Sequence, residues 1–162
     1  MPESRMIANL NTAVQMEMSA AHQYQLHAHV LEDWGLDRLA AQMRAEMTEE
    51  LGHSDRFIER IMFLKGDPEI AFQKLPHRAK TLVEMFKADL ADEEEAIEVY
   101  SRAAREAADA GDIGTRVLFE EIALDEEGHK SWLELQLDLI ERIGEPAYSA
   151  KYVSIGGSDT SA

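Results

Sequence analysis

The sequence EELGH at residues 49–53 is nearly repeated as DEEGH at residues 125–129. Each copy places a Glu three residues before a His: Glu50 before His53, and Glu126 before His129. On an α-helix, residues three apart lie on the same face and one turn from each other, so each pair can bind one metal ion together. The repeat therefore predicts two helical halves of one metal site.

The composition restricts which metal site is possible. The 162 residues include no cysteine, which excludes disulfides, thiolate metal sites and iron–sulfur centres. The 32 acidic residues against 16 basic ones give a net charge of −16, which argues against nucleic-acid or anionic-membrane partners and favours cations. The sequence has no signal-peptide pattern and no apolar run of membrane-spanning length, so a cytoplasmic protein is expected.

Length and hydrophobic patterning predict a single all-α domain over residues 1–162. Apolar residues recur at helical spacing in four long stretches, and the chain has only nine Gly and four Pro. Four amphipathic helices of this length make a four-helix bundle. We expect helices at about 4–33, 36–64, 80–109 and 112–143, a short fifth helix at about 146–153, and a disordered tail at 156–162.

Two short turns and one long connector predict the order of these helices. Gly35 and Gly111 are suited to the residue that follows a helix C-terminus, and the short loops around them make each helix pair an antiparallel hairpin. Between the hairpins lies KGDPEIAFQKLPHR, residues 65–78. Extended, about fourteen residues span on the order of 45 Å, which is the length of a helix of about thirty residues. The connector can therefore cross the whole bundle.

Each apolar stripe contains one acid, and the spacing of these acids sets their heights in the bundle. A buried carboxylate is costly unless it is paired or bound to a metal. Glu17 and Glu50 are 33 residues apart, as are Glu93 and Glu126, and both midpoints fall in the predicted turns. Residues equidistant from the turn of an antiparallel hairpin lie at the same height. The two acids of each hairpin should therefore face each other.

The second hairpin repeats the first at an offset of 76 residues, so that Glu17 corresponds to Glu93. Packing of the hairpins about a pseudo-twofold axis would bring all four acids and both histidines together. One Glu from each of two helices and a Glu-x-x-His from each of the others is the pattern of di-iron carboxylate bundles. We predict two metal ions with these ligands: terminal Glu17 and His53, terminal Glu93 and His129, and bridging Glu50 and Glu126.

Three stretches are highly similar to the bacterioferritin family: LNTAVQMEMSAAHQYQLHAHVLEDWGLDRL, EELGHSDRFIERIMFLKG and DEEGHKSWLELQLDLI. The resemblance covers roughly residues 5–152 and implies a ferritin-like four-helix bundle with one long crossover and a short C-terminal fifth helix. It also implies a hollow 24-subunit shell that stores ferric mineral. Each subunit would contain two iron ions and oxidise Fe(II) to Fe(III) with O2 or H2O2. The six family ligands fall on the six residues predicted above.

The chain departs from the family at the position that binds haem. The family uses a Met directly after the second-helix ligand Glu, and this position is Leu51 here. Because leucine has no donor atom, haem is not expected in this chain alone. Met47, one turn earlier, is interpreted as a core residue. The resemblance also allows a mixed shell, in which a second, Met-bearing bacterioferritin subunit binds the haem.

Several residues near the predicted ligands have two possible roles. Tyr24 lies seven residues after Glu17, and Tyr100 lies seven after Glu93, so both lie two turns along the ligand face. Core packing with a satisfied hydroxyl is the ordinary role of such tyrosines. For Tyr24 the resemblance also implies a catalytic place beside the metals, whereas Tyr100 is interpreted as a core residue. Glu46 and Glu49 either face the shell interior and pass iron inward or are solvated.

The ligand set leaves other functions open beside iron storage and detoxification by a ferroxidase. Di-iron or di-manganese oxidases and peroxide scavengers use the same ligands without storing mineral. A DNA-protecting mini-ferritin fits less well, because that family assembles its site between subunits. A non-enzymatic bundle could hold structural zinc in the same place.

Overall fold

The computed structural model describes residues 2–154, and the tail expected to be disordered, 156–162, lies outside this range. These residues form five α-helices, and no strand occurs among them, so the all-α prediction is confirmed. The helices are α1 (Pro2–Asp33), α2 (Asp37–Phe63), α3 (Leu82–Asp109), α4 (Ile113–Ile143) and α5 (Glu145–Ala150).

The helix ends follow local signals in the sequence. Gly35 (φ 79°) and Gly111 (φ 72°) adopt the left-handed conformation directly after the turns that end α1 and α3. Thr81 and Asp112 cap the N-termini of α3 and α4 through their side-chain oxygens. The four long helices begin and end within two residues of the expected bounds, whereas α5 ends at Ala150, three residues before the expected end.

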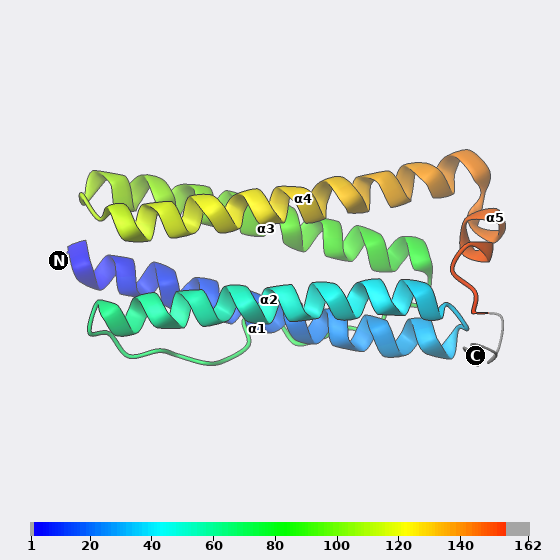
Figure 1. Ribbon diagram of the computed structural model, residues 1–162, viewed down its shortest axis with the longest axis horizontal. Coiled ribbons are helices and arrows are strands. Elements are labelled where there is room, and N and C mark those ends of the chain that lie inside the picture. The colour runs from blue at the N-terminus through cyan, green and yellow to red at the C-terminus, as the bar shows by residue number, and fades with distance from the viewer. Residues whose placement is uncertain (1, 155–162) are drawn as a thin grey trace, which may run out of the picture.

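The chain forms two antiparallel hairpins, α1 with α2 and α3 with α4, joined by a segment that runs from one end of the bundle to the other (Figure 1). A polar stripe on α1 holds this crossover in place. Asn11 bonds the backbone of residues 67 and 69, Ser19 accepts from the backbone N–H groups of residues 73 and 74, and Gln23 bonds both backbone groups of residue 77. The crossover therefore packs along α1.

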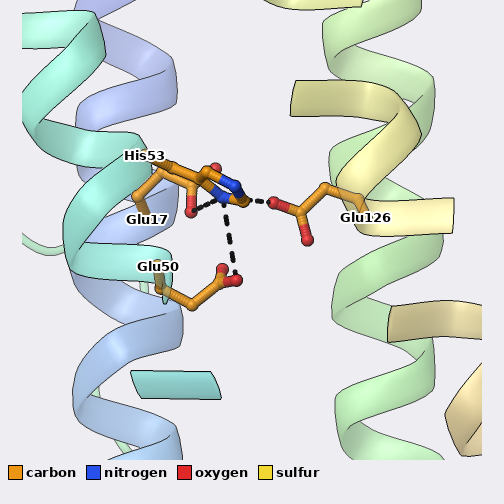
Figure 2. A group of neighbouring side chains, drawn as sticks. All are labelled: Glu17, Glu50, His53 and Glu126. Carbon is orange, nitrogen blue, oxygen red and sulfur yellow. Dashed lines mark ion pairs between the residues drawn. The ribbon is translucent and has the colours of Figure 1, made fainter. Parts of the chain in front are cut away.

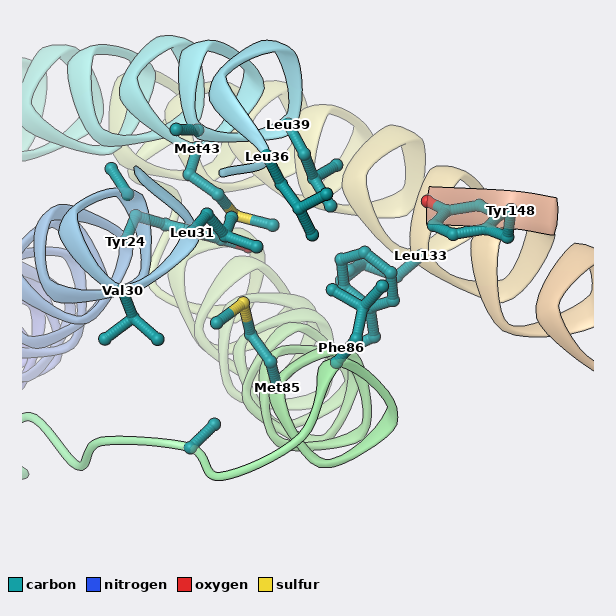
Figure 3. Close-up of a cluster of buried hydrophobic side chains, with 14 of the residues drawn as sticks. Tyr24, Val30, Leu31, Leu36, Leu39, Met43, Met85, Phe86, Leu133 and Tyr148 are labelled. Atoms are coloured by element: carbon teal, nitrogen blue, oxygen red, sulfur yellow. The ribbon is translucent and has the colours of Figure 1, made fainter. Parts of the chain in front are cut away.

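The apolar core consists of two clusters separated along the bundle axis. One lies toward the end closed by α5 and contains Leu31, Met43, Phe86 and Leu133, with Tyr148 from α5 packed edge-on against Phe86 (Figure 3). The other lies toward the opposite end and includes Leu10, Val14, Phe57, Ile61, Tyr100 and Phe119. On each long helix, the residues between the two clusters include the acid predicted to be a ligand. The predicted site is thus a polar layer between two apolar ones.

No helix in the part of the chain that the structure describes is both long enough and apolar enough to cross a membrane.

Candidate metal centre

The structure brings the six predicted ligands together in the middle of the bundle. Four helices contribute, and every one of the six side chains is at least nine-tenths buried. The contributions are Glu17 from α1, Glu50 and His53 from α2, Glu93 from α3, and Glu126 and His129 from α4. The six residues that were selected by their spacing in the sequence therefore lie in one layer of the bundle.

One half of the site is built around the Nδ1 atom of His53 (Figure 2). This nitrogen lies 2.9 Å from Glu126 Oε1, 3.4 Å from Glu17 Oε2 and 3.8 Å from Glu50 Oε1. The three carboxylates come from three different helices. One imidazole nitrogen and three carboxylates that converge in this way form a donor set for a single cation.

The other half repeats this arrangement around the Nδ1 atom of His129. This nitrogen lies 3.0 Å from Glu126 Oε2, 3.2 Å from Glu50 Oε1 and 3.5 Å from Glu93 Oε1. Glu126 thus presents one oxygen to each half, and Glu50 Oε1 faces both histidines. These are the positions expected of bridging carboxylates, with Glu93 terminal in this half.

The far nitrogen of each imidazole also meets a carboxylate. His53 Nε2 lies 3.1 Å from Asp125, and His129 Nε2 lies 3.0 Å from Glu46 and 3.1 Å from Glu49. The Asp125 carboxylate is hydrogen-bonded to His53 Nε2, which holds the N–H there and leaves Nδ1 for a metal. Sequence reasoning missed Asp125, although it lies 76 residues after Glu49 and therefore obeys the same repeat.

Two buried tyrosines hold the terminal carboxylates. The Tyr24 hydroxyl donates to Glu93 Oε1 at 2.5 Å, and the Tyr100 hydroxyl donates to Glu17 Oε1 at 2.5 Å. Each tyrosine therefore reaches from its own hairpin to a carboxylate of the other. The interpretation of Tyr100 as a core residue was incomplete, because it packs in the core and also makes this bond. Tyr100 lies 76 residues after Tyr24, and this repeat could have indicated its role from the sequence.

Many of the carboxylate and imidazole atoms that could bind a metal ion have no hydrogen-bond partner among the described residues. They face one another at ion-pair distances, but without hydrogen-bond geometry. Buried polar atoms without partners are rare in folded proteins and point to a missing ion or water. The atoms are Glu17 Oε2, Glu50 Oε1, His53 Nδ1, both Glu126 oxygens, and both His129 nitrogens.

The pKa values of the ligands reflect this crowding. Burial, together with the charges of Glu17 and Glu126, raises the pKa of Glu50 well above its ordinary value. Burial also raises the pKa of Glu93, to about 8. Burial alone would lower the pKa of His53, but the carboxylates of Glu126 and Glu17 outweigh it and raise this pKa to about 10. The site must therefore take up protons or cations to offset the repulsion among its carboxylates.

Comparison with known proteins places the chain in a family. The model of the family described as the ferritin-like domain matches residues 7–143. The bacterioferritin of Rhodobacter capsulatus is 40% identical over 149 residues, which cover 91% of each chain. The bacterioferritin of Brucella melitensis is 39% identical over 146 residues, or 90% of this chain and 91% of that one. The chain belongs to the bacterioferritin family.

Solved bacterioferritin structures have the same fold. The structure of Rhodobacter capsulatus bacterioferritin, described with a metal-free dinuclear site and a haem iron, has a TM-score of 0.91 at 35% identity and covers 96% of both chains. Mycobacterium tuberculosis bacterioferritin, BfrA, has a TM-score of 0.90 at 35% identity, covering 93% of this chain and 94% of that one. The predicted ferritin-like bundle is confirmed, and membership of the bacterioferritin family supports a role in iron storage.

The position at which the resemblance to bacterioferritins implies a haem ligand lies on α2. Leu51 occupies it, is 38% exposed and offers no donor atom. Met47, one turn away, is partly buried and packs against the core cluster that contains Met43. The residues at this position therefore do not fit the ligation of a haem iron by a thioether.

Proposed function

We propose that this chain is an iron-storing ferroxidase, which oxidises Fe(II) to Fe(III) at an intrasubunit two-metal centre with O2 or H2O2. The ferric product is deposited as mineral inside a hollow 24-subunit shell. One observation carries the proposal: buried imidazole and carboxylate atoms from α1, α2 and α4 converge without a hydrogen-bond partner among the described residues, and Glu93 of α3 joins them. Family membership supplies the iron chemistry that this geometry suits.

The donor set fits iron. Its ligands are carboxylate oxygens and imidazole nitrogens, and the chain has no cysteine. Glu17 with His53 would hold one ion and Glu93 with His129 the other, and the remaining two carboxylates would bridge them. Iron bound there supplies the electrons that reduce O2 or H2O2.

The surrounding residues tune this site for oxidation. Anionic oxygen ligands stabilise Fe(III) more than Fe(II), which favours loss of an electron. Tyr24 and Tyr100 each hold one terminal carboxylate beside the metal position. Tyr100 bonds Glu17 Oε1 and leaves Glu17 Oε2 facing His53, whereas Tyr24 bonds Glu93 Oε1, the same oxygen that faces His129. The Asp125 carboxylate, hydrogen-bonded to His53 Nε2, holds that imidazole ring in orientation, and Glu46 lies at ion-pair distance from His129 Nε2.

Glu46 and Glu49 provide a way out of the centre. Together with His129 they form a further group of donor atoms that could hold a cation. Glu46 is 8% exposed, whereas the side chain of Glu49 is 46% exposed, so the group leads from the interior to the surface. Ferric ions that leave the centre would pass along these carboxylates to the site of mineral growth.

The proposed shell is consistent with the surface of the subunit. Several large apolar side chains are mostly exposed in the single chain, and a shell would bury those that lie at its subunit contacts. They include Phe63, Ile70, Leu75, Ile113 and Leu124. We propose a shell of this chain alone without haem, or a mixed shell in which a Met-bearing bacterioferritin subunit supplies the haem site.

A non-storage oxidase or peroxide scavenger with two iron or manganese ions is the second candidate, because the same donor set serves it. Size-exclusion chromatography with light scattering separates the two, since a monomer or dimer that turns over without accumulating mineral would be such an oxidase.

The ferroxidase assignment is tested by Glu17→Ala and Glu93→Ala, each of which removes one terminal ligand. Both should abolish rapid Fe(II) oxidation in stopped-flow absorbance and leave assembly intact. Glu134→Ala is the matched control, because this exposed acid on α4 lies opposite Lys130 at the surface. An unchanged initial rate in either ligand variant would refute the assignment.

A further inference from the structure

A cavity of about 310 Å³ lies between α1 and α3, beneath the crossover. Its inner wall includes the metal-centre carboxylates Glu17, Glu50 and Glu93, and its outer rim includes Lys74 and Asp92. Since one water occupies about 30 Å³, the cavity has room for roughly ten waters. A hydrated cation can therefore fit between the rim and the centre.

Asp89 lies on the wall of this cavity, one helical turn before Glu93 on the same face of α3. The residue is 2% exposed. Its Oδ1 accepts a hydrogen bond from His27 Nε2 at 2.9 Å, but its Oδ2 has no hydrogen-bond partner among the described residues. A buried carboxylate oxygen without a partner is costly to retain, which calls for a reason beyond packing.

The protonation of His27 follows from its neighbours. Gln23 accepts from the backbone N–H of His77 at 2.8 Å and donates to the backbone oxygen of His77 at 2.9 Å, which fixes the orientation of its amide. The Gln23 amide nitrogen also lies 3.3 Å from His27 Nδ1, which must then accept. His27 is therefore the neutral Nε2–H tautomer. It satisfies one oxygen of Asp89 without neutralising the charge.

From this geometry we propose that Asp89 is a relay site for hydrated divalent cations on a route from the crossover to the metal centre. The inference rests on the proposed function, because it supplies the ferrous substrate to that centre. The cation enters at the rim of the cavity, meets the free Oδ2 of Asp89, and moves one turn along α3 to Glu93.

The rim already holds a positively charged group. Lys74 Nζ lies 3.1 Å from Asp92 and also contacts Glu95, and all three side chains are about half exposed. A divalent cation can displace the ammonium of this flexible side chain and take its place between the two acids. The rim is thus able to collect cations before they enter.

The small number of ligands at Asp89 suits a relay. Passage needs sites that attract an ion but release it again, whereas a storage site needs a full ligand set. The centre offers one imidazole and several carboxylates for each ion, but Asp89 offers one oxygen in a cavity with space for water. Cations should therefore stay at Asp89 briefly and at the centre for long.

The test compares how fast and how tightly Co(II) binds to the metal-free protein. Asp89→Asn keeps an oxygen that accepts from His27 and removes only the charge. Stopped-flow absorbance of Co(II) at the centre should show binding about tenfold slower in Asp89→Asn than in the wild type. Equilibrium titration should still give two Co(II) per subunit, with affinities unchanged within about twofold.

Two further variants complete the experiment. Asp138→Asn removes the same charge from the exposed face of α4, where Asp138 pairs with Arg142, and should leave the rate unchanged. Ala20→Leu narrows the cavity with Asp89 intact and should slow binding. Equal rates for the wild type and Asp89→Asn overturn the relay, as does a lower stoichiometry or affinity in Asp89→Asn. If the wild type itself binds fewer than two Co(II) per subunit, the proposed two-metal centre is wrong, and so is the relay that would supply it.

Discussion

Metal binding at this centre should release protons, because the imidazole atoms that face the metal positions carry them in the metal-free protein. The pKa of His53 is raised to about 10, so this side chain is an imidazolium at pH 7. Its Nδ1 lies among the carboxylates of Glu126, Glu17 and Glu50. A metal ion needs the lone pair of that nitrogen and must displace the proton.

The size of this effect follows from the structure. Deprotonation of His53 at pH 7, three pH units below its pKa of about 10, costs the metal about 4 kcal/mol of binding free energy. The carboxylates of Glu126 and Glu46 likewise raise the pKa of His129 against the effect of its burial. The pKa of Glu93, about 8, adds most of a third proton at pH 7. We expect roughly two to four protons to leave when two ions bind.

The sign of the pH dependence is fixed by the same groups. These pKa values are higher in the metal-free protein than in the metal-bound one, so protons compete with the metal. Apparent affinity should rise about tenfold per pH unit for each proton displaced. The contribution of Glu93 should end near pH 8 and that of His53 near pH 10.

Isothermal titration calorimetry measures the proton count directly. Co(II) is added to metal-free protein at pH 7 in buffers of different ionisation enthalpy, and the slope of observed against buffer enthalpy gives the protons released. His29→Ala should leave the count unchanged, because this histidine is exposed and pairs with Glu32 at the surface. A slope near zero in the wild type would mean that the imidazoles are neutral, and it would contradict the ion pairs described here.

Three further outcomes are expected. Tyr24→Phe and Tyr100→Phe each remove a hydrogen bond to a buried carboxylate and should lower the unfolding free energy of the metal-free protein by roughly 1.5–3 kcal/mol in urea titrations. Asp112→Ala removes the cap of α4 and should cost about 1–2 kcal/mol at pH 7. Burial would raise the pKa of Asp112, but the hydrogen bonds of this carboxylate hold its pKa below the ordinary value of an aspartate. The ionised Asp112 therefore stabilises the folded protein at pH values above the ordinary pKa, and this stabilisation is lost as the pH falls through the lowered pKa. Haem added to Leu51→Met should produce a Soret band that the wild type lacks, whereas identical spectra would contradict the assigned haem position.

Much of the fold and the core of the site could be predicted because both depend on spacing along the helices. Equal spacings of Glu17 to Glu50 and Glu93 to Glu126 set the register of each hairpin without any knowledge of packing. An acid within an apolar stripe is visible in a single sequence, since it breaks the pattern that the rest of the helix follows. These two observations identified the four acids, and the repeated Glu-x-x-His motif added His53 and His129.

The groups that sequence reasoning missed depend on contacts between the hairpins. Tyr100 reaches Glu17 across the interface of α3 with α1, and the rotation of one hairpin against the other decides this contact. Asp89 and His27 are paired in the same interface. The 76-residue repeat could not indicate Asp89, because the corresponding residue of the first hairpin is Ala13, an apolar core residue. A search based on the 76-residue repeat finds residues that have a counterpart in the other hairpin and misses residues that have none.

The positions of these groups give the centre two distinct faces. α1 contacts α2 and α3, and α4 contacts the same two helices, so the pseudo-twofold axis runs from the α1–α3 face to the α2–α4 face. The cavity with Asp89 opens on the first face, and Glu46, Glu49 and Asp125 lie at the second, beyond the imidazoles. Cations that enter at one face can therefore leave at the other. Such a through-route is useful where the two faces of a subunit meet different compartments, as in a closed shell, and it gives a free-standing oxidase no advantage. The placement of Asp89 on one face and of Glu46, Glu49 and Asp125 on the other thus favours storage over simple turnover.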